Sequence, residues 1–103
     1  MPVGESVVEA ILNLVRSARP DPDAPPSDVT RLIAWGPGPR ASQALMLTVR
    51  ARALVDGRLA PSIDDVLALA EPVLQHRMAL TFAARADGHT VQNVIRKVKE
   101  ALA

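Results

Sequence analysis

Apolar residues recur at helical spacing in several separate parts of the chain. The first such part predicts a helix over residues 5–18, with glutamates early and arginines late, as the helix dipole prefers. A second, shorter apolar face predicts a helix over about residues 27–35 that ends at Gly36. A long helix is predicted from Pro39 to Val55, and a last amphipathic helix over about residues 90–102.

The helix predicted over residues 39–55 has the most apolar pattern in the chain. Its apolar side chains wrap more than one face of the helical cylinder, which is typical of a helix buried on several sides. They are Ala44, Leu45, Leu47, Val49, Ala51 and Leu54. We therefore expect this helix to be the central helix of the core.

Turn and capping residues mark the limits of these helices. Asp56-Gly57 closes the long helix, and Ser62 with Asp65 has the spacing of a capping box that opens the next one. Asp87-Gly88 is a further stop signal, followed by Thr90 as the cap of the last helix.

Proline affects two further regions. Pro20, Pro22, Pro25 and Pro26 predict a stiff, exposed connector without regular structure, and Ser27 or Asp28 can cap the helix that follows it. Pro72 should end or kink the helix that begins after Ser62, with helical structure resuming over residues 73–86. The pattern leaves open whether this region is one bent helix or two.

The composition favours a single all-α domain. Of the 103 residues 49% are hydrophobic, yet there is one Trp, one Phe and no Tyr, so aliphatic side chains must build the core. We predict a small bundle of about five to six helices over residues 1–103, with the helix at 90–102 packing on the bundle or extending from it. The chain has no Cys, no apolar run long enough to span a membrane and no signal peptide, so a cytoplasmic location is expected.

Arg40 is the residue whose placement is hardest to explain locally. Gly36, Pro37 and Gly38 form an elbow, and Pro39 opens the long helix, so Arg40 lies in its first turn. A cation there opposes the helix dipole, at a cost of about 0.3–1 kcal/mol unless an anion offsets it. Backbone N–H groups and a guanidinium at one helix start form a possible phosphate site. The alternative is a surface arginine that is solvated or paired with a carboxylate.

Other residues provide little further chemistry. The phosphate-binding loop of nucleotide hydrolases, which ends in Gly-Lys-Ser/Thr, is missing from this sequence, and we predict no catalytic residues and no metal site. Asp64 and Asp65 suit the first turn of a helix better than a metal site. We interpret His76-Arg77 as a helix-end histidine beside a salt-bridged arginine and His89 as a solvated loop residue. Asp56 can pair with Arg52, four residues before it.

Several blocks of the sequence, in this order and spacing, resemble the C-terminal lid domain of MoxR-type AAA+ ATPases. The blocks are residues 14–20, 35–54, 56–58, 64–66, 72–77, 80–82 and 87–88. In that family the elbow motif ends in an arginine, the sensor-2 residue, which reaches the γ-phosphate of the nucleotide. The matching residue here is Arg40, positioned by Gly36, Gly38 and Pro39. The sequence departs from the family pattern at Pro37, which stiffens the elbow, and at Gln75.

The resemblance implies a lid that closes over ATP and Mg²⁺ held by the N-terminal ATPase core of the same protein. It also implies a homo-oligomeric ring with chaperone-like activity, whose lids contact neighbouring subunits and which can act with a protein that has a von Willebrand factor A domain. The chain alone should neither bind ATP tightly nor hydrolyse it. The alternative is a free-standing helical module that binds protein or nucleic acid, suggested by Trp35, Phe82 and the arginines near the long helix. The net charge of +1 argues against nucleic acid.

Overall fold

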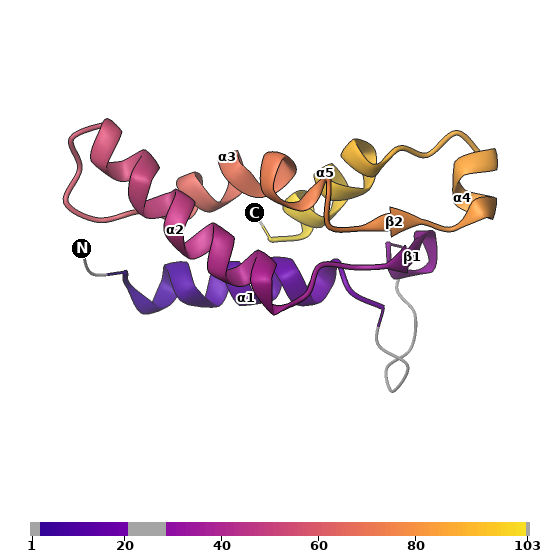
Figure 1. Cartoon of the computed structure of the whole chain (residues 1–103), viewed down its shortest axis with the longest axis horizontal. Helices are drawn as coiled ribbons and strands as arrows, with labels where there is room; N and C mark the ends of the chain where they lie inside the picture. Colours follow the sequence, from indigo (N-terminus) through magenta and orange to yellow (C-terminus); the bar gives the residue numbers. More distant parts are fainter. Residues whose placement is uncertain (1–2, 21–28, 103) are drawn as a thin grey trace.

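The longer helices pack on one another and form the body of the domain (Figure 1). The computed structural model describes residues 3–20 and 29–102, so the predicted connector beyond Pro20 and the caps Ser27 and Asp28 lie outside the described residues. These longer helices are α1 (Glu5–Ser17), α2 (Pro39–Val55), α3 (Ile63–Leu74) and α5 (Val91–Leu102). Contacts join α1 to α2, α3 and α5, and join α3 to α2 and α5. The expected all-α class is confirmed, with one short additional sheet in the described part.

Each of these helices contributes one apolar face to a common core. The side chains that are less than 2% exposed and largest in volume come from all four helices, so the core runs through the whole bundle. They include Ile11, Leu14, Leu45, Val49, Val66, Leu74, Val94 and Ile95. Aliphatic residues therefore fill this core, as the composition predicted.

The prediction that α2 is buried on several sides is wrong. Its buried residues are Ala41, Leu45, Val49 and Ala53, which recur every four positions and form one narrow stripe. Leu47 and Leu54 are about two-thirds exposed. The reason is that α1 and α3, the two helices with which α2 makes its main contacts, cover only one side of it.

The predicted helix over residues 27–35 is also wrong in its described part. Residues Thr30–Leu32 form one 3₁₀ turn, followed by the strand β1 (Ile33–Trp35). This strand pairs antiparallel with β2 (Ala79–Leu80), and the Thr81 N–H donates to the Leu32 carbonyl oxygen at 2.9 Å. A run of three apolar residues fits either a helix or a strand, and a partner far along the chain decides between them.

Residues 63–86 contain two separate helices rather than one bent helix, and the second is much shorter than expected. Helix α3 continues through Pro72 for only two more residues and ends at Leu74. Beyond β2 the chain forms the single-turn helix α4 (Phe82–Ala86), so the helix expected over residues 73–86 is mostly replaced by a turn and a strand. Phe82, the first residue of α4, is 87% exposed.

The stop and cap signals predicted at Gly57, Ser62, Gly88 and Thr90 are confirmed, whereas Gly36 follows a strand and ends no helix. Gly57 and Gly88 adopt φ of 74° and 89°, the left-handed region that favours glycine after a helix. Ser62 and Asp65 form the capping box at the start of α3. The Thr90 hydroxyl accepts a hydrogen bond from the Asn93 N–H at 3.1 Å and so caps α5. In the part of the chain that is described, no helix is long and apolar enough to cross a bilayer.

Candidate functional site

The elbow before α2 is held tightly against the end of α1. A Cβ atom on Gly36 would lie 2.3 Å from the Ala18 carbonyl oxygen and 2.8 Å from the Arg19 Cα, so only glycine allows this approach. Pro37, the departure from the family pattern, is fully buried. The elbow is therefore part of the packed body of the domain, and Gly36 is needed for a close backbone contact rather than for ending a helix.

The start of α2 follows directly from this elbow. Gly38 is the N-cap residue, has extended backbone angles and provides no side-chain cap, and Pro39 is the first helical residue, as predicted. Proline has no N–H, and the Ala41 N–H donates to the Gly38 carbonyl oxygen at 3.0 Å. The first turn also contains no acidic residue. Of residues 39–41, Arg40 therefore has the N–H that remains open to a ligand.

The Arg40 side chain is exposed at this helix start. Its guanidinium makes no hydrogen bond or ion pair with the described residues, so the carboxylate partner considered as the alternative is not found among them. An arginine in this position can bind an incoming anion bidentately. The sequence predicted several free backbone N–H groups at this helix start. Among residues 39–41 only the N–H of Arg40 remains free, so the guanidinium would provide most of the hydrogen bonds to an anion.

A second group of charged residues joins the far end of α2 to α3. Asp65, which is fully buried, accepts hydrogen bonds from both terminal nitrogens of Arg58, at 2.8 Å and 2.6 Å. Arg52 of α2 donates to the same carboxylate, and the Ser62 N–H donates to it at 2.7 Å. Bidentate contacts of this kind are strong and directional. Asp65 therefore joins α2, the loop after it and the first turn of α3.

These contacts determine the protonation of the pair. The hydrogen bonds from Arg58 hold the pKa of the Asp65 carboxyl well below its usual range, although burial acts in the opposite direction. The same contact with Asp65 raises the pKa of Arg58. Both groups are therefore charged throughout the physiological range of pH.

The sequence identified Asp65 only as a capping residue and missed its ion pairs. The expected pair between Arg52 and Asp56 is not formed, because Arg52 binds Asp65 while Asp56 accepts from Arg58 at 3.0 Å. Arg77 was expected in a salt bridge, and instead it donates to the Val73 carbonyl oxygen at 2.7 Å. His76 beside it is exposed, whereas His89, expected to be solvated, is only partly exposed. Within the described residues no three acidic, His or Cys side chains gather as a metal site would require.

Comparison with known protein families identifies the family of this domain. The family called the AAA lid domain matches residues 26–98, which is more than half of the chain. The chain belongs to the AAA lid domain family. The resemblance seen in the sequence is thereby confirmed.

Two relatives and one solved structure agree with this assignment. The lid domain is 33% identical over 101 residues to the chaperone MoxR1 of Mycobacterium tuberculosis and 31% identical over 98 residues to YeaC, an uncharacterized protein of Bacillus subtilis. These matches cover 98% and 95% of this chain but only 27% and 28% of the relatives. A crystal structure from Cytophaga hutchinsonii, described as that of a "putative ATPase", has the same fold, with a TM-score of 0.83 at 24% identity over 95% of this chain and 30% of that one.

The matched fraction of each relative shows that this chain corresponds to one domain of a longer protein in those relatives. The chain spans less than a third of the length of each relative, and it is a lid domain of the MoxR family of AAA+ ATPases. A complete nucleotide site needs a phosphate loop and carboxylates that hold Mg²⁺, and this sequence has no Gly-Lys-Ser/Thr phosphate-loop motif. Arg40 and the elbow before it are the candidate residues through which the lid domain could contribute to such a site.

Proposed function

We propose that residues 1–103 act as one lid over a nucleotide site and that Arg40 binds the γ-phosphate of ATP. The rest of the site, including the Mg²⁺ ligands and the phosphate loop, would belong to an N-terminal ATPase core of the same protein. The observation that carries the proposal is the state of Arg40, which lies exposed and without a partner among the described residues at the start of α2, where it opposes the helix dipole. A phosphate would supply the negative charge that this helix start lacks.

The proposed mechanism is a switch that depends on the third phosphate. While ATP is bound, Arg40 has an anionic partner and the lid is held against the core. After hydrolysis and loss of phosphate this partner is gone, and the lid prefers another orientation. The close contact of Gly36 with the end of α1 and the burial of Pro37 support motion of the lid as one body, because these two residues have no room to move relative to α1.

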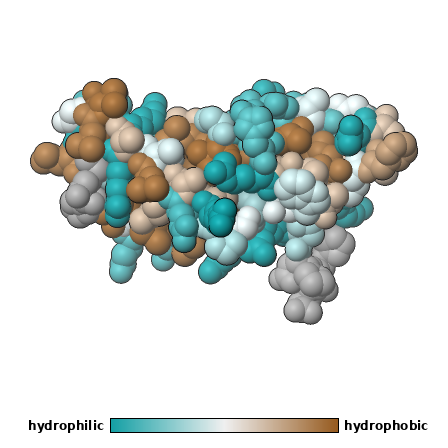
Figure 2. Space-filling model, in the orientation of Figure 1, coloured by the Kyte–Doolittle hydropathy of each residue, from teal (hydrophilic) through white to brown (hydrophobic). Residues whose placement is uncertain are grey.

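The apolar surface at the end of α2 suggests where a neighbouring subunit of a homo-oligomeric ring would bind. Val55 is 87% and Leu59 90% exposed, and Leu54 beside them is 65% exposed. Figure 2 shows apolar surface gathered at this end of the long axis of the domain. Adjacent exposed apolar side chains are typical of contact surfaces. We further propose that the ring lies in the cytoplasm and has chaperone-like activity. The resemblance suggests a protein with a von Willebrand factor A domain as an additional partner.

The test uses the full-length protein, with the ATPase core, and compares ATP with ADP. Arg40→Ala should weaken ATP binding by about tenfold to a hundredfold, the effect of losing a hydrogen bond to a charged group worth about 1.5–3 kcal/mol. ADP binding should stay within twofold, because ADP has no γ-phosphate. Arg96→Ala, which removes an exposed arginine from α5, is the matched control. An Arg40→Ala protein with unchanged ATP affinity and turnover would show that Arg40 is only a surface residue.

A further inference from the structure

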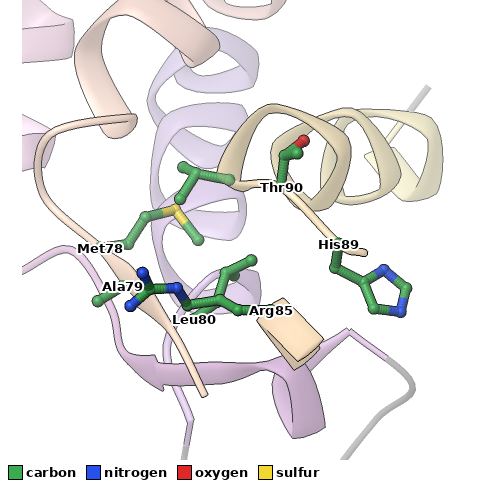
Figure 3. Close-up of a pocket in the computed structure, with 7 residues that line it drawn as sticks. Met78, Ala79, Leu80, Arg85, His89 and Thr90 are labelled. Carbon is green, nitrogen blue, oxygen red and sulfur yellow. The ribbon is translucent and has the colours of Figure 1, made fainter. Parts of the chain in front are cut away.

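A pocket of about 240 Å³ lies between β2, α4 and the start of α5 (Figure 3). Buried Met78 and Leu80, together with Val91, give it an apolar lining, and Arg85 and His89 add two basic side chains. Pockets for cofactors and drug-sized ligands usually measure about 300–1,000 Å³. A volume of this size therefore suits one apolar side chain of a partner better than a whole small molecule.

The two ionisable side chains that line the pocket, Arg85 and His89, are both basic. Figure 3 shows Arg85 extending toward Ala79, with the His89 imidazole pointing in another direction. Arg85 is exposed and has no ion pair within the described part of the chain, and no acidic side chain lines the pocket. An apolar pocket beside an unpaired guanidinium is complementary to an apolar side chain that has a carboxylate next to it.

The tryptophan and the phenylalanine of the chain belong to elements that adjoin or frame this pocket, β1 and α4. Its one tryptophan, Trp35, is 57% exposed and pairs across the sheet with Ala79, which lines the pocket, while its one phenylalanine, Phe82, is 87% exposed and begins α4. A shift of register between Ile33 and Trp35 places Trp35 opposite Ala79, so that Ile33 is buried while Trp35 is exposed. Aromatic residues and arginine dominate the binding energy of protein interfaces.

We propose that this region, the α4 surface, binds an acidic segment of a partner protein. We define the α4 surface as the pocket with Arg85 at its edge, together with Trp35 and Phe82. The segment would insert one apolar side chain into the pocket and place a neighbouring carboxylate on Arg85, while Trp35 and Phe82 contact the residues on either side. This binding is separate from the proposed nucleotide role, since it uses β1, β2 and α4 rather than the start of α2 and needs no nucleotide.

The experiment is a selection from a random peptide library displayed on phage, with the 103-residue chain immobilised and nucleotide omitted. Enriched peptides should carry an apolar residue beside Asp or Glu. The strongest of them, made synthetically, should change the fluorescence of Trp35, the one tryptophan of the chain. Arg85→Glu should weaken its binding at least about tenfold, the effect of losing one charge-assisted hydrogen bond. Arg96→Glu, the same change at an exposed site outside the pocket, should leave the affinity within twofold.

Phe82→Ala provides a second test, because an exposed side chain can be shortened without loss of the fold. This variant should also bind the selected peptide more weakly, whereas its circular dichroism spectrum and melting temperature should equal those of the wild type. A single-stranded dT oligonucleotide should bind weakly or not at all. The proposal is overturned if no peptide is enriched, if the enriched peptides lack acidic residues, if Arg85→Glu and Arg96→Glu bind equally well, or if the oligonucleotide binds more tightly than the peptides.

Discussion

Replacing Asp65 with asparagine tests whether its buried carboxylate holds α2 and α3 together. Asparagine keeps the shape of the side chain but removes the charge, and its NH₂ group presents donors where the carboxylate accepted from Arg58 or Arg52. The hydrogen bond from the Ser62 N–H can survive if the amide oxygen takes that side. The substitution therefore removes the charge interaction and keeps most of the packing.

The expected loss of stability follows from the contacts. Breaking a fully buried ion pair by removing one partner costs about 3–5 kcal/mol, chiefly because the remaining charge stays buried. Here the side chains of Arg52 and Arg58 are 42% and 36% exposed, so water can hydrate them after the change. We therefore expect a loss of about 2–4 kcal/mol in the free energy of unfolding, a large share of the roughly 5–15 kcal/mol typical of a domain. For a domain of about 100 residues this lowers the melting temperature by about 10–25 °C.

Urea unfolding of the 103-residue chain, followed by circular dichroism, measures this loss. Asp64→Asn is the matched control, because Asp64 is the adjacent exposed carboxylate in the same first turn of α3. The Asp64→Asn substitution should lower the free energy of unfolding by only about 0.3–1 kcal/mol, because it removes no more than the interaction of the carboxylate with the helix dipole. Equal losses for the two variants would show that Asp65 contributes no more than an ordinary first-turn carboxylate and would refute the reasoning.

The remaining predictions concern acid, the elbow, Arg40 and the end of α2. The folded state lowers the pKa of Asp65, so its contribution to stability is complete well above the unfolded pKa of about 4 and is lost as pH falls toward the folded value; the difference in urea midpoint between wild type and Asp65→Asn should therefore shrink steadily as the pH falls below about 5. Gly36→Ala should cost about 2 kcal/mol or more, since its Cβ would meet the backbone of α1, whereas Gly38→Ala, with free space around it, should cost less than about 1 kcal/mol by the same measurement. Arg40→Ala should leave the melting temperature of the lid unchanged or slightly raised, because a cation that opposes the dipole is removed, and a marked fall would assign Arg40 a structural role. In the full-length protein, Val55→Ser with Leu59→Ser should shift sedimentation toward smaller assemblies, and an unchanged ring would exclude this surface from the subunit contact.

The position of Arg40 shows what local sequence signals can predict about this fold. Pro39 at the first helical position and Asp56-Gly57 after the last one set the limits of α2, because both act through backbone angles and hydrogen bonds of adjacent residues. Once Pro39 begins the helix, Arg40 must lie in its first turn. The candidate phosphate-binding residue could thus be predicted without knowledge of the tertiary structure.

Contacts between distant residues decided the rest. Ile33 becomes part of a strand because Leu80 lies opposite it, and no short window of sequence contains both residues. Asp65 has the spacing of a capping box, but Arg52 and Arg58 reach it only when α2 packs on α3.

The sequence by itself therefore determined the main helices, their caps and the placement of Arg40, because these depend on neighbouring residues. Only the tertiary structure decided which apolar side chains are buried, which strand pairs form and which charges meet. Burial and ion pairing depend on which residues the rest of the folded chain brings close. Leu47 and Val49 are both apolar residues of α2, yet Val49 is buried in the core and Leu47 is exposed on the surface.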